Sequence, residues 1–104
     1  MNTKLLNMSD FKKTFVYKTE RGDDLDSIAE KFSTTKQIVV TNNLLTSKPE
    51  QGDMLVIERA NGKEYTVKPF DTIERLSGGD KRREIEILKN NKIDFIYVGQ
   101  KIYL

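Results

Sequence analysis

The chain has 104 residues, which is enough for one ordinary domain or two very small ones. Its 18 Lys and Arg residues against 16 Asp and Glu residues leave a formal net charge of +2, which argues against an electrostatically driven nucleic-acid binder. Cysteine and histidine are both absent, so the sequence has no disulfide framework, lacks the commonest zinc ligand and predicts neither a metal site nor a cofactor.

Residues 1–14 form the first predicted segment, an N-terminal arm. A short amphipathic helix is one interpretation, and a frayed arm is favoured over it. The arm has no apolar run that suits a secretory signal, and no segment of the chain approaches the length of a membrane span. We therefore expect no membrane insertion and a cytoplasmic location for the chain as written. Export, release by lysis or a place in a longer protein would put it in a cell wall or an assembled particle.

Residues 15–58 predict a first structural unit. Residues 15–19 alternate strand-forming side chains between two faces, which indicates a short strand. Asp23 or Asp24 can then cap a helix, and of the two roles open to Asp23 a cap is favoured over a ligand contact. The apolar stripe of this helix has the i, i+3, i+4, i+7 spacing and consists of Leu25, Ile28, Ala29 and Phe32.

The same unit continues with a second helix and a second strand. Residues 33–35 end the first helix and cap the second, and Asn42-Asn43 is most simply a helix stop. Residues 49–52 indicate a turn, and residues 54–57 indicate a strand.

Residues 64–104 predict a second unit with the same order of elements. A strand at 65–68 precedes Asp71 and Glu74, whose spacing resembles a capping box. Gly78-Gly79 must break the first helix, Asp80 can cap the next, and Asn90-Asn91 again indicates a helix stop. The chain ends in a strand at 101–104.

The two units are imperfect copies of each other, with Tyr17 and Tyr65 standing 48 positions apart. A period of this length means that one small structural unit occurs twice. The predicted fold class is α+β, with two tandem βααβ units. In each unit, a two-stranded antiparallel sheet is covered on one face by two short helices.

The segment at 59–63 is either a linker or a hairpin turn. Asn61-Gly62 lies between strand-forming residues, which is a strong hairpin signal. A hairpin would pair the last strand of the first unit with the first strand of the second, would place Gly62 at positive φ and would make the two units one rigid body.

Several motifs in both copies resemble a LysM module. They are residues 65–73 (YTVKPFDTI), Asn90-Asn91 and residues 98–104 (VGQKIYL), with looser counterparts at 22–25, 27–29, 42–44 and Gly52. Arg21, Asp24 and Phe70 depart from the usual Pro, Thr and Gly of that family. The resemblance implies the βααβ fold and recognition of N-acetylglucosamine polymers such as peptidoglycan or chitin.

The resemblance also implies where a sugar would lie, in a shallow groove between the loop after the first strand and the loop before the second. Carried over to this chain, the groove residues are Gly22, Asp23, Asp24, Leu25, Leu44, Leu45 and Thr46 in the first copy. In the second copy they are Phe70, Asp71, Thr72, Ile73, Ile93, Asp94 and Phe95. Leu25 and Ile73 are equally well explained as core residues.

The two predicted sites should differ because Phe70 stands where the first copy has Gly22. Phe70 adds bulk at the lip of the groove and disfavours positive φ, which glycine permits. It can stack on a sugar face, but obstruction of the groove or packing in the core is favoured, because the resemblance implies a position that is usually left bare. We therefore expect the first copy to bind sugar before the second.

No catalytic residues are predicted. Asp23, Asp24 and Asp26 form the tightest carboxylate cluster, but helix capping and the helix dipole already account for them. The leading function is non-catalytic glycan binding through both modules. The alternative is a protein-protein adaptor, as in phage-tail-like baseplates or spore coats, that uses the fold without binding sugar.

Overall fold

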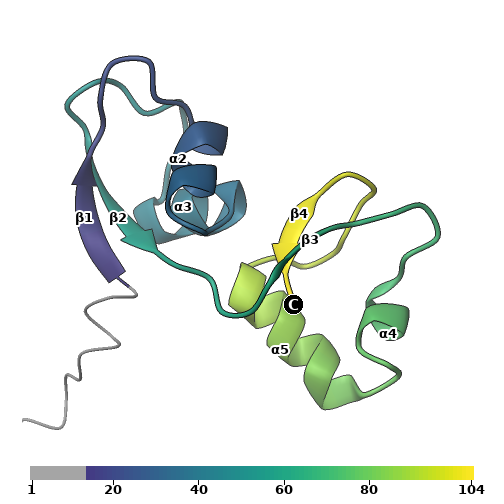
Figure 1. Cartoon of the computed structure of the whole chain (residues 1–104). Coiled ribbons are helices and arrows are strands. Elements are labelled where there is room, and N and C mark those ends of the chain that lie inside the picture. The colour runs from purple at the N-terminus through teal and green to yellow at the C-terminus, as the bar shows by residue number, and fades with distance from the viewer. Residues whose placement is uncertain (1–13) are drawn as a thin grey trace, which may run out of the picture. The chain divides into compact units, whose positions relative to one another are not determined.

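The computed structural model describes residues 14–104, which fall into two compact units that meet between Arg59 and Ala60. The predicted N-terminal arm, residues 1–14, lies outside the described residues except for Thr14, which begins the first strand. Each unit is described by itself below, and Figure 1 shows the elements of both.

The first unit consists of strand β1 (Thr14–Lys18), helices α2 (Leu25–Lys31) and α3 (Lys36–Asn43), and strand β2 (Met54–Glu58). The two strands pair antiparallel. Both helices lie on one side of this ribbon (Figure 1). The inward-facing side chains form a core of Ile28, Val39, Leu55 and Ile57, against which Phe15, Tyr17, Leu25, Phe32 and Leu45 pack. The predicted alternation of the first strand and the predicted stripe of the first helix are confirmed.

The second unit repeats this order with strand β3 (Glu64–Thr66), helices α4 (Ile73–Leu76) and α5 (Lys81–Asn91), and strand β4 (Lys101–Tyr103). β3 pairs antiparallel with β4. Its core is smaller and consists of Val67, Ile87 and Ile102. The predicted α+β class, with a two-stranded antiparallel sheet and two helices in each copy, is therefore confirmed.

At the N-termini of two helices, the structure corrects the sequence interpretation. Asp24, and not Asp23, caps α2 in a capping box with Ser27: its Oδ1 accepts from the Ser27 N–H at 2.7 Å, and the Asp24 N–H donates to Ser27 Oγ at 3.0 Å. Thr72 caps α4, so the predicted Asp71–Glu74 capping box is wrong. Thr35, the last residue of the predicted capping segment 33–35, caps α3, and the predicted cap of α5 by Asp80 is confirmed.

The hairpin predicted around Asn61-Gly62 does not form in the described chain, because β2 pairs with β1 and β3 pairs with β4. Lys63 instead exchanges two backbone hydrogen bonds with Leu104, of 3.0 and 2.9 Å, which extend the β3–β4 ladder. Gly62 does have the predicted positive φ, at 91°. A Cβ there would lie 2.0 Å from the Leu104 carbonyl oxygen, so this close approach of two backbones requires glycine.

Candidate functional site

Each sheet ends in two β-turns that lie side by side. The turns span residues 20–23 and 50–53 in the first unit, and 68–71 and 97–100 in the second. In all four, the N–H of the fourth residue donates to the carbonyl of the first, at 3.0 to 3.1 Å. The third residue has positive φ in each turn, which makes them type II: Gly22 at 88°, Gly52 at 94°, Phe70 at 72° and Gly99 at 88°.

A side chain locks each of these turns a second time. Asp23, Asp53 and Asp71 each accept a hydrogen bond at 2.8 Å from the backbone N–H three residues earlier. Gln100 does the same for Tyr97 at 3.0 Å. Asp23 and Asp71 therefore hold the turns that precede the helices, whereas the sequence interpretation had treated them as helix caps.

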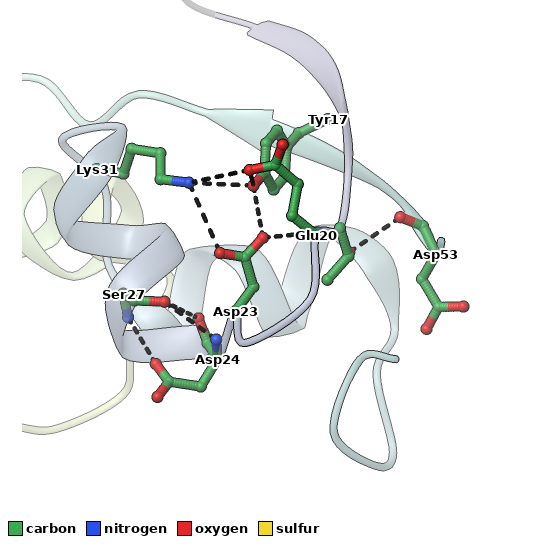
Figure 2. Close-up of polar contacts among 8 residues, drawn as sticks. Tyr17, Glu20, Asp23, Asp24, Ser27, Lys31 and Asp53 are labelled. Atoms are coloured by element: carbon green, nitrogen blue, oxygen red, sulfur yellow. Dashed lines mark hydrogen bonds and ion pairs between the residues drawn. The ribbon is translucent and has the colours of Figure 1, made fainter. Parts of the chain in front are cut away.

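Asp23 and Asp71 also accept a hydrogen bond from a tyrosine hydroxyl of the first strand, Tyr17 in one unit and Tyr65 in the other. In the first unit, Lys31 of helix α2 joins this pair (Figure 2). Its Nζ lies 3.1 Å from the Tyr17 hydroxyl and 3.6 Å from Asp23 Oδ1. The tyrosine hydrogen bond is the main cause that lowers the pKa of each Asp, and the turn N–H adds to it. The same hydrogen bond raises the pKa of each tyrosine.

The second asparagine of each Asn-Asn pair ties a helix to the closing strand. Asn91 is fully buried, and its Nδ2 donates to the carbonyls of Ile87 at 2.8 Å and Tyr103 at 2.9 Å. Its Oδ1 accepts from the Tyr103 N–H at 2.7 Å. Asn43 makes the matching contacts with Val39 and Val56 in the first unit. These residues do end their helices, as predicted, and they also fix the strand beside them.

The predicted groove residues of the first unit divide into buried supports and exposed edges. Leu25 and Leu45 pack against the same core, so they bring the loop after β1 and the loop after α3 to a common base. Leu44, at the end of α3, has φ 52° and is 85% exposed. Gly22, Asp24 and Thr46 are exposed as well. A ligand would therefore meet turn backbone, a helix start and one large apolar side chain.

The second unit keeps the buried supports and changes the edge. Ile73 and Ile93 pack on its core in the way that Leu25 and Leu45 do in the first unit. Thr72 is exposed at its helix start, Asp94 is exposed, and Phe95 also projects into solvent. Phe70 is 87% exposed, so of its two favoured roles, obstruction of the groove and packing in the core, the second is wrong. Its left-handed backbone costs about 1–2 kcal/mol in a residue other than glycine.

The pair of turns at the end of each sheet is called the tip of that unit, and the tips of the two units differ in chemistry. The first tip, formed by Arg21, Gly22, Gln51 and Gly52, is polar. A hollow of about 630 Å³ beside it is lined by Lys18, Thr19, Glu20, Arg21, Gln51 and Gly52. The second tip, formed at the matching positions by Pro69, Phe70, Val98 and Gly99, is apolar.

The sequence interpretation missed three recurring features: the tyrosine–aspartate bond, the asparagine bridge and the paired turns. The first two had a signal in the repeat, because Tyr, Asp and Asn recur at the same offset of 48. The turns before the closing strands recur at an offset of 47, as Gly52 and Gly99 show. Within residues 14–104, no group of three or more His, Cys, Asp or Glu side chains could hold a metal ion. No helix in this part of the chain is long and apolar enough to cross a membrane.

The chain was compared with curated proteins, solved structures and models of protein families. No curated protein sequence matches the chain. Among solved structures, the chain is similar to the spore cortex-lytic enzyme SleL of Bacillus cereus, at 25% identity and a TM-score of 0.43, over 88% of this chain and 22% of that one. It is also similar to SleL of Bacillus megaterium, at 26% identity and a TM-score of 0.42, over 86% and 22%. The chain spans about a fifth of the length of these enzymes.

A comparison with models of protein families matches residues 17–58 to the LysM domain. This range runs from Tyr17 of β1 through both helices to the last residue of β2, which is nearly the whole described part of the first unit. The second unit has the same order of elements, although the family match does not extend to it. Residues 17–58 are therefore a LysM domain, followed by a second unit of the same βααβ design.

Proposed function

We propose that this chain is a non-catalytic binding module for a glycan that contains N-acetylglucosamine, such as peptidoglycan or chitin. The observation that carries this proposal is the LysM domain at residues 17–58, since that family generally binds peptidoglycan. The same design in the second unit supports a chain with two sites, in which two weak contacts with one polymer give a higher avidity.

The first unit offers groups that suit a sugar with acetamido and hydroxyl substituents. Turn and helix-start backbone near Gly22 and Asp24 provides hydrogen-bonding groups, while Leu44 can cover the apolar face of a pyranose ring. Leu25 and Leu45 hold both loops on the core, so this surface is formed before a ligand arrives. Preformed sites avoid the cost of ordering loops on binding.

The carboxylates of this surface support binding without catalysis. A glycosidase pairs a nucleophile or base with a general acid whose pKa is raised. The Tyr17 hydrogen bond lowers the pKa of Asp23, which is the wrong direction for a general acid. Asp24 is held in the α2 capping box by Ser27. Both acids thus have structural roles that a catalytic role would disturb.

The test is retention of the full-length chain on insoluble peptidoglycan and on chitin, read by sedimentation. We expect retention on at least one polymer and weaker retention for Leu44→Asn, because asparagine tolerates the left-handed conformation of this position but lacks the apolar side chain. Val16→Thr serves as the control, since it removes an exposed apolar side chain from the outer face of β1 and should bind like the wild type.

Failure of the wild-type chain to bind either polymer would overturn the proposal and favour the adaptor function. Isolation of a stoichiometric complex with one purified structural protein, without sugar binding, would have the same meaning. Equal retention of Leu44→Asn and the wild type would remove Leu44 from the binding surface.

A further inference from the structure

Asn61-Gly62 is a motif that neither the paired turns nor the helix caps use. Among residues 14–104, Asn61 is the asparagine that lies outside a helix, and it is exposed. Asparagine is a thermolabile residue, because the backbone nitrogen that follows it can attack its side-chain amide. Here the following residue is glycine, which has no side chain to shield that nitrogen. The site therefore combines an accessible amide with the least hindered neighbour.

The other asparagines of the described chain are protected from this reaction. They lie in α3 and α5, where the N–H groups of the residues that follow each Asn-Asn pair, Leu44 and Lys92, donate to helix carbonyls. Their side-chain amides are also occupied. Each Nδ2 donates a hydrogen bond of 2.9 to 3.0 Å, from Asn42 to Glu58, from Asn43 to Val56, from Asn90 to Asn61 and from Asn91 to Tyr103.

The main chain of Asn61 is anchored by bonds that do not involve its side-chain amide. Its N–H donates to Asn90 Oδ1 at 3.3 Å, and its carbonyl accepts from Asn90 Nδ2 at 3.0 Å. On the other side of Gly62, Lys63 is paired with Leu104. Within the described residues, the Gly62 N–H donates to no backbone carbonyl. The nitrogen in question is thus outside the ladder, while the chain on both sides of it is fixed.

We propose that Asn61 is a deamidation site whose isoaspartate product opens the end of the β3–β4 ladder. The Gly62 nitrogen gives its proton to a base in the solvent and forms a bond to Asn61 Cγ. The side-chain nitrogen takes up a proton from water and leaves as ammonia, so that a cyclic imide remains. Water then adds to one of the two imide carbonyls and breaks the bond from that carbon to the ring nitrogen. Opening at Cγ gives aspartate, and opening at the main-chain carbon gives isoaspartate.

Isoaspartate changes the main chain where the fold leaves no room for it. The chain then runs through Cβ and Cγ of residue 61, which adds one carbon–carbon bond of about 1.5 Å before Gly62. A Cβ on Gly62 would already lie 2.0 Å from the Leu104 carbonyl oxygen, so the backbones are in close contact here. The added carbon cannot be accommodated while the Asn61–Asn90 bonds and the Lys63–Leu104 pair both remain. Aspartate adds a charge but no main-chain atom, so it preserves both.

The experiment is incubation of the full-length chain at mildly alkaline pH, followed by peptide mass mapping and by labelling of isoaspartate with a protein isoaspartyl methyltransferase. We expect Asn61 to be converted before any asparagine of α3 or α5, with a change in formal net charge from +2 to +1. Conversion should become faster as the pH rises, because the attacking nitrogen must lose a proton. In the isoaspartate fraction, the Leu104 amide should exchange its hydrogen faster than in the unmodified chain.

Two variants separate the reaction from its structural effect. Asn61→Gln keeps an exposed amide but would have to close a larger ring, so it should stay unmodified. Freshly prepared Asn61→Asp carries the new charge without the added carbon, so its Leu104 amide should exchange at the wild-type rate. Faster exchange in this variant would show that charge, and not the added carbon, opens the ladder.

Three results would overturn the proposal. They are an Asn61 amide that persists through the incubation, equal conversion of the wild type and Asn61→Gln, and an isoaspartate fraction whose Leu104 amide exchanges at the wild-type rate. The proposal is independent of sugar binding, so each of these results would leave the proposed function standing.

Discussion

Replacement of Asn91 by alanine should be the most damaging single polar substitution in the second unit. Asn91 has 0% exposure and saturates both backbone groups of Tyr103, accepting from its N–H at 2.7 Å and donating to its carbonyl at 2.9 Å. Loss of the amide leaves two buried groups unpaired, at about 1–3 kcal/mol each, and the better helix propensity of alanine returns about 0.6 kcal/mol. The expected net loss is roughly 1–5 kcal/mol.

Asn43→Ala provides a matched control, because Asn43 makes the corresponding bonds to Val56 in the first unit. Asn43 is only half-buried and Val56 is exposed, so water can replace the lost partners. The loss there should be about 0.5–1.5 kcal/mol. The two substitutions therefore remove the same amide hydrogen bonds, once from a buried site and once from a site that water can reach.

The assay is urea unfolding of the full-length chain, followed by the amide signals of each unit separately. A domain of this size has only a few kcal/mol of stability, so Asn91→Ala should leave the second unit largely unfolded while the first stays folded. Equal losses in the two variants, or a larger loss for Asn43→Ala, would refute the idea that burial of the freed backbone groups sets the cost.

Three further predictions concern stability. The pKa values of Asp23 and Asp71 are lowered, so the stability that these carboxylates contribute is present above the unfolded carboxyl pKa of about 3.9 and is lost as the pH falls through the folded pKa values. Tyr65→Phe should therefore flatten the fall in melting temperature of the second unit between about pH 5 and pH 2. Parallel curves of melting temperature against pH for the variant and the wild type would contradict this. Asp24→Ala should cost the first unit about 1 kcal/mol through the lost cap of α2, as measured by chemical unfolding, whereas an unchanged midpoint would show that the capping box is dispensable. Gly62→Ala should disrupt the Lys63–Leu104 pairing, because its Cβ would meet the Leu104 carbonyl carbon at 2.7 Å, and hydrogen exchange of the Leu104 amide at the wild-type rate would argue against it.

The sequence alone determined the repeat, the order of the elements and the fold class. These follow from local signals: the alternation at residues 15–19, the stripe from Leu25 to Phe32, and the glycine and asparagine residues that end helices. Most helix caps were also predictable, because a cap depends on residues that are neighbours along the chain.

Contacts between distant residues decided what the sequence left open. Asp23 and Asp71 accept hydrogen bonds from tyrosines on the first strand of each unit. The helix caps therefore lie one residue later in the chain, at Asp24 and Thr72. Asn61-Gly62 has good local hairpin chemistry, but Lys63 is already paired with Leu104 at the far end of the chain.

The candidate site shows the same division. Sequence reasoning placed Leu25, Leu45, Ile73 and Ile93 near the expected groove, and in the structure these side chains pack on the cores of their units. The exposure of Phe70 was decided by the tertiary structure, since Phe70 stands at the third position of a turn and is not among the residues that pack on the core of its unit. Local propensity therefore defined the elements, while the competition among distant hydrogen-bonding partners and the space left by the packed core decided which side chains remain available to a ligand.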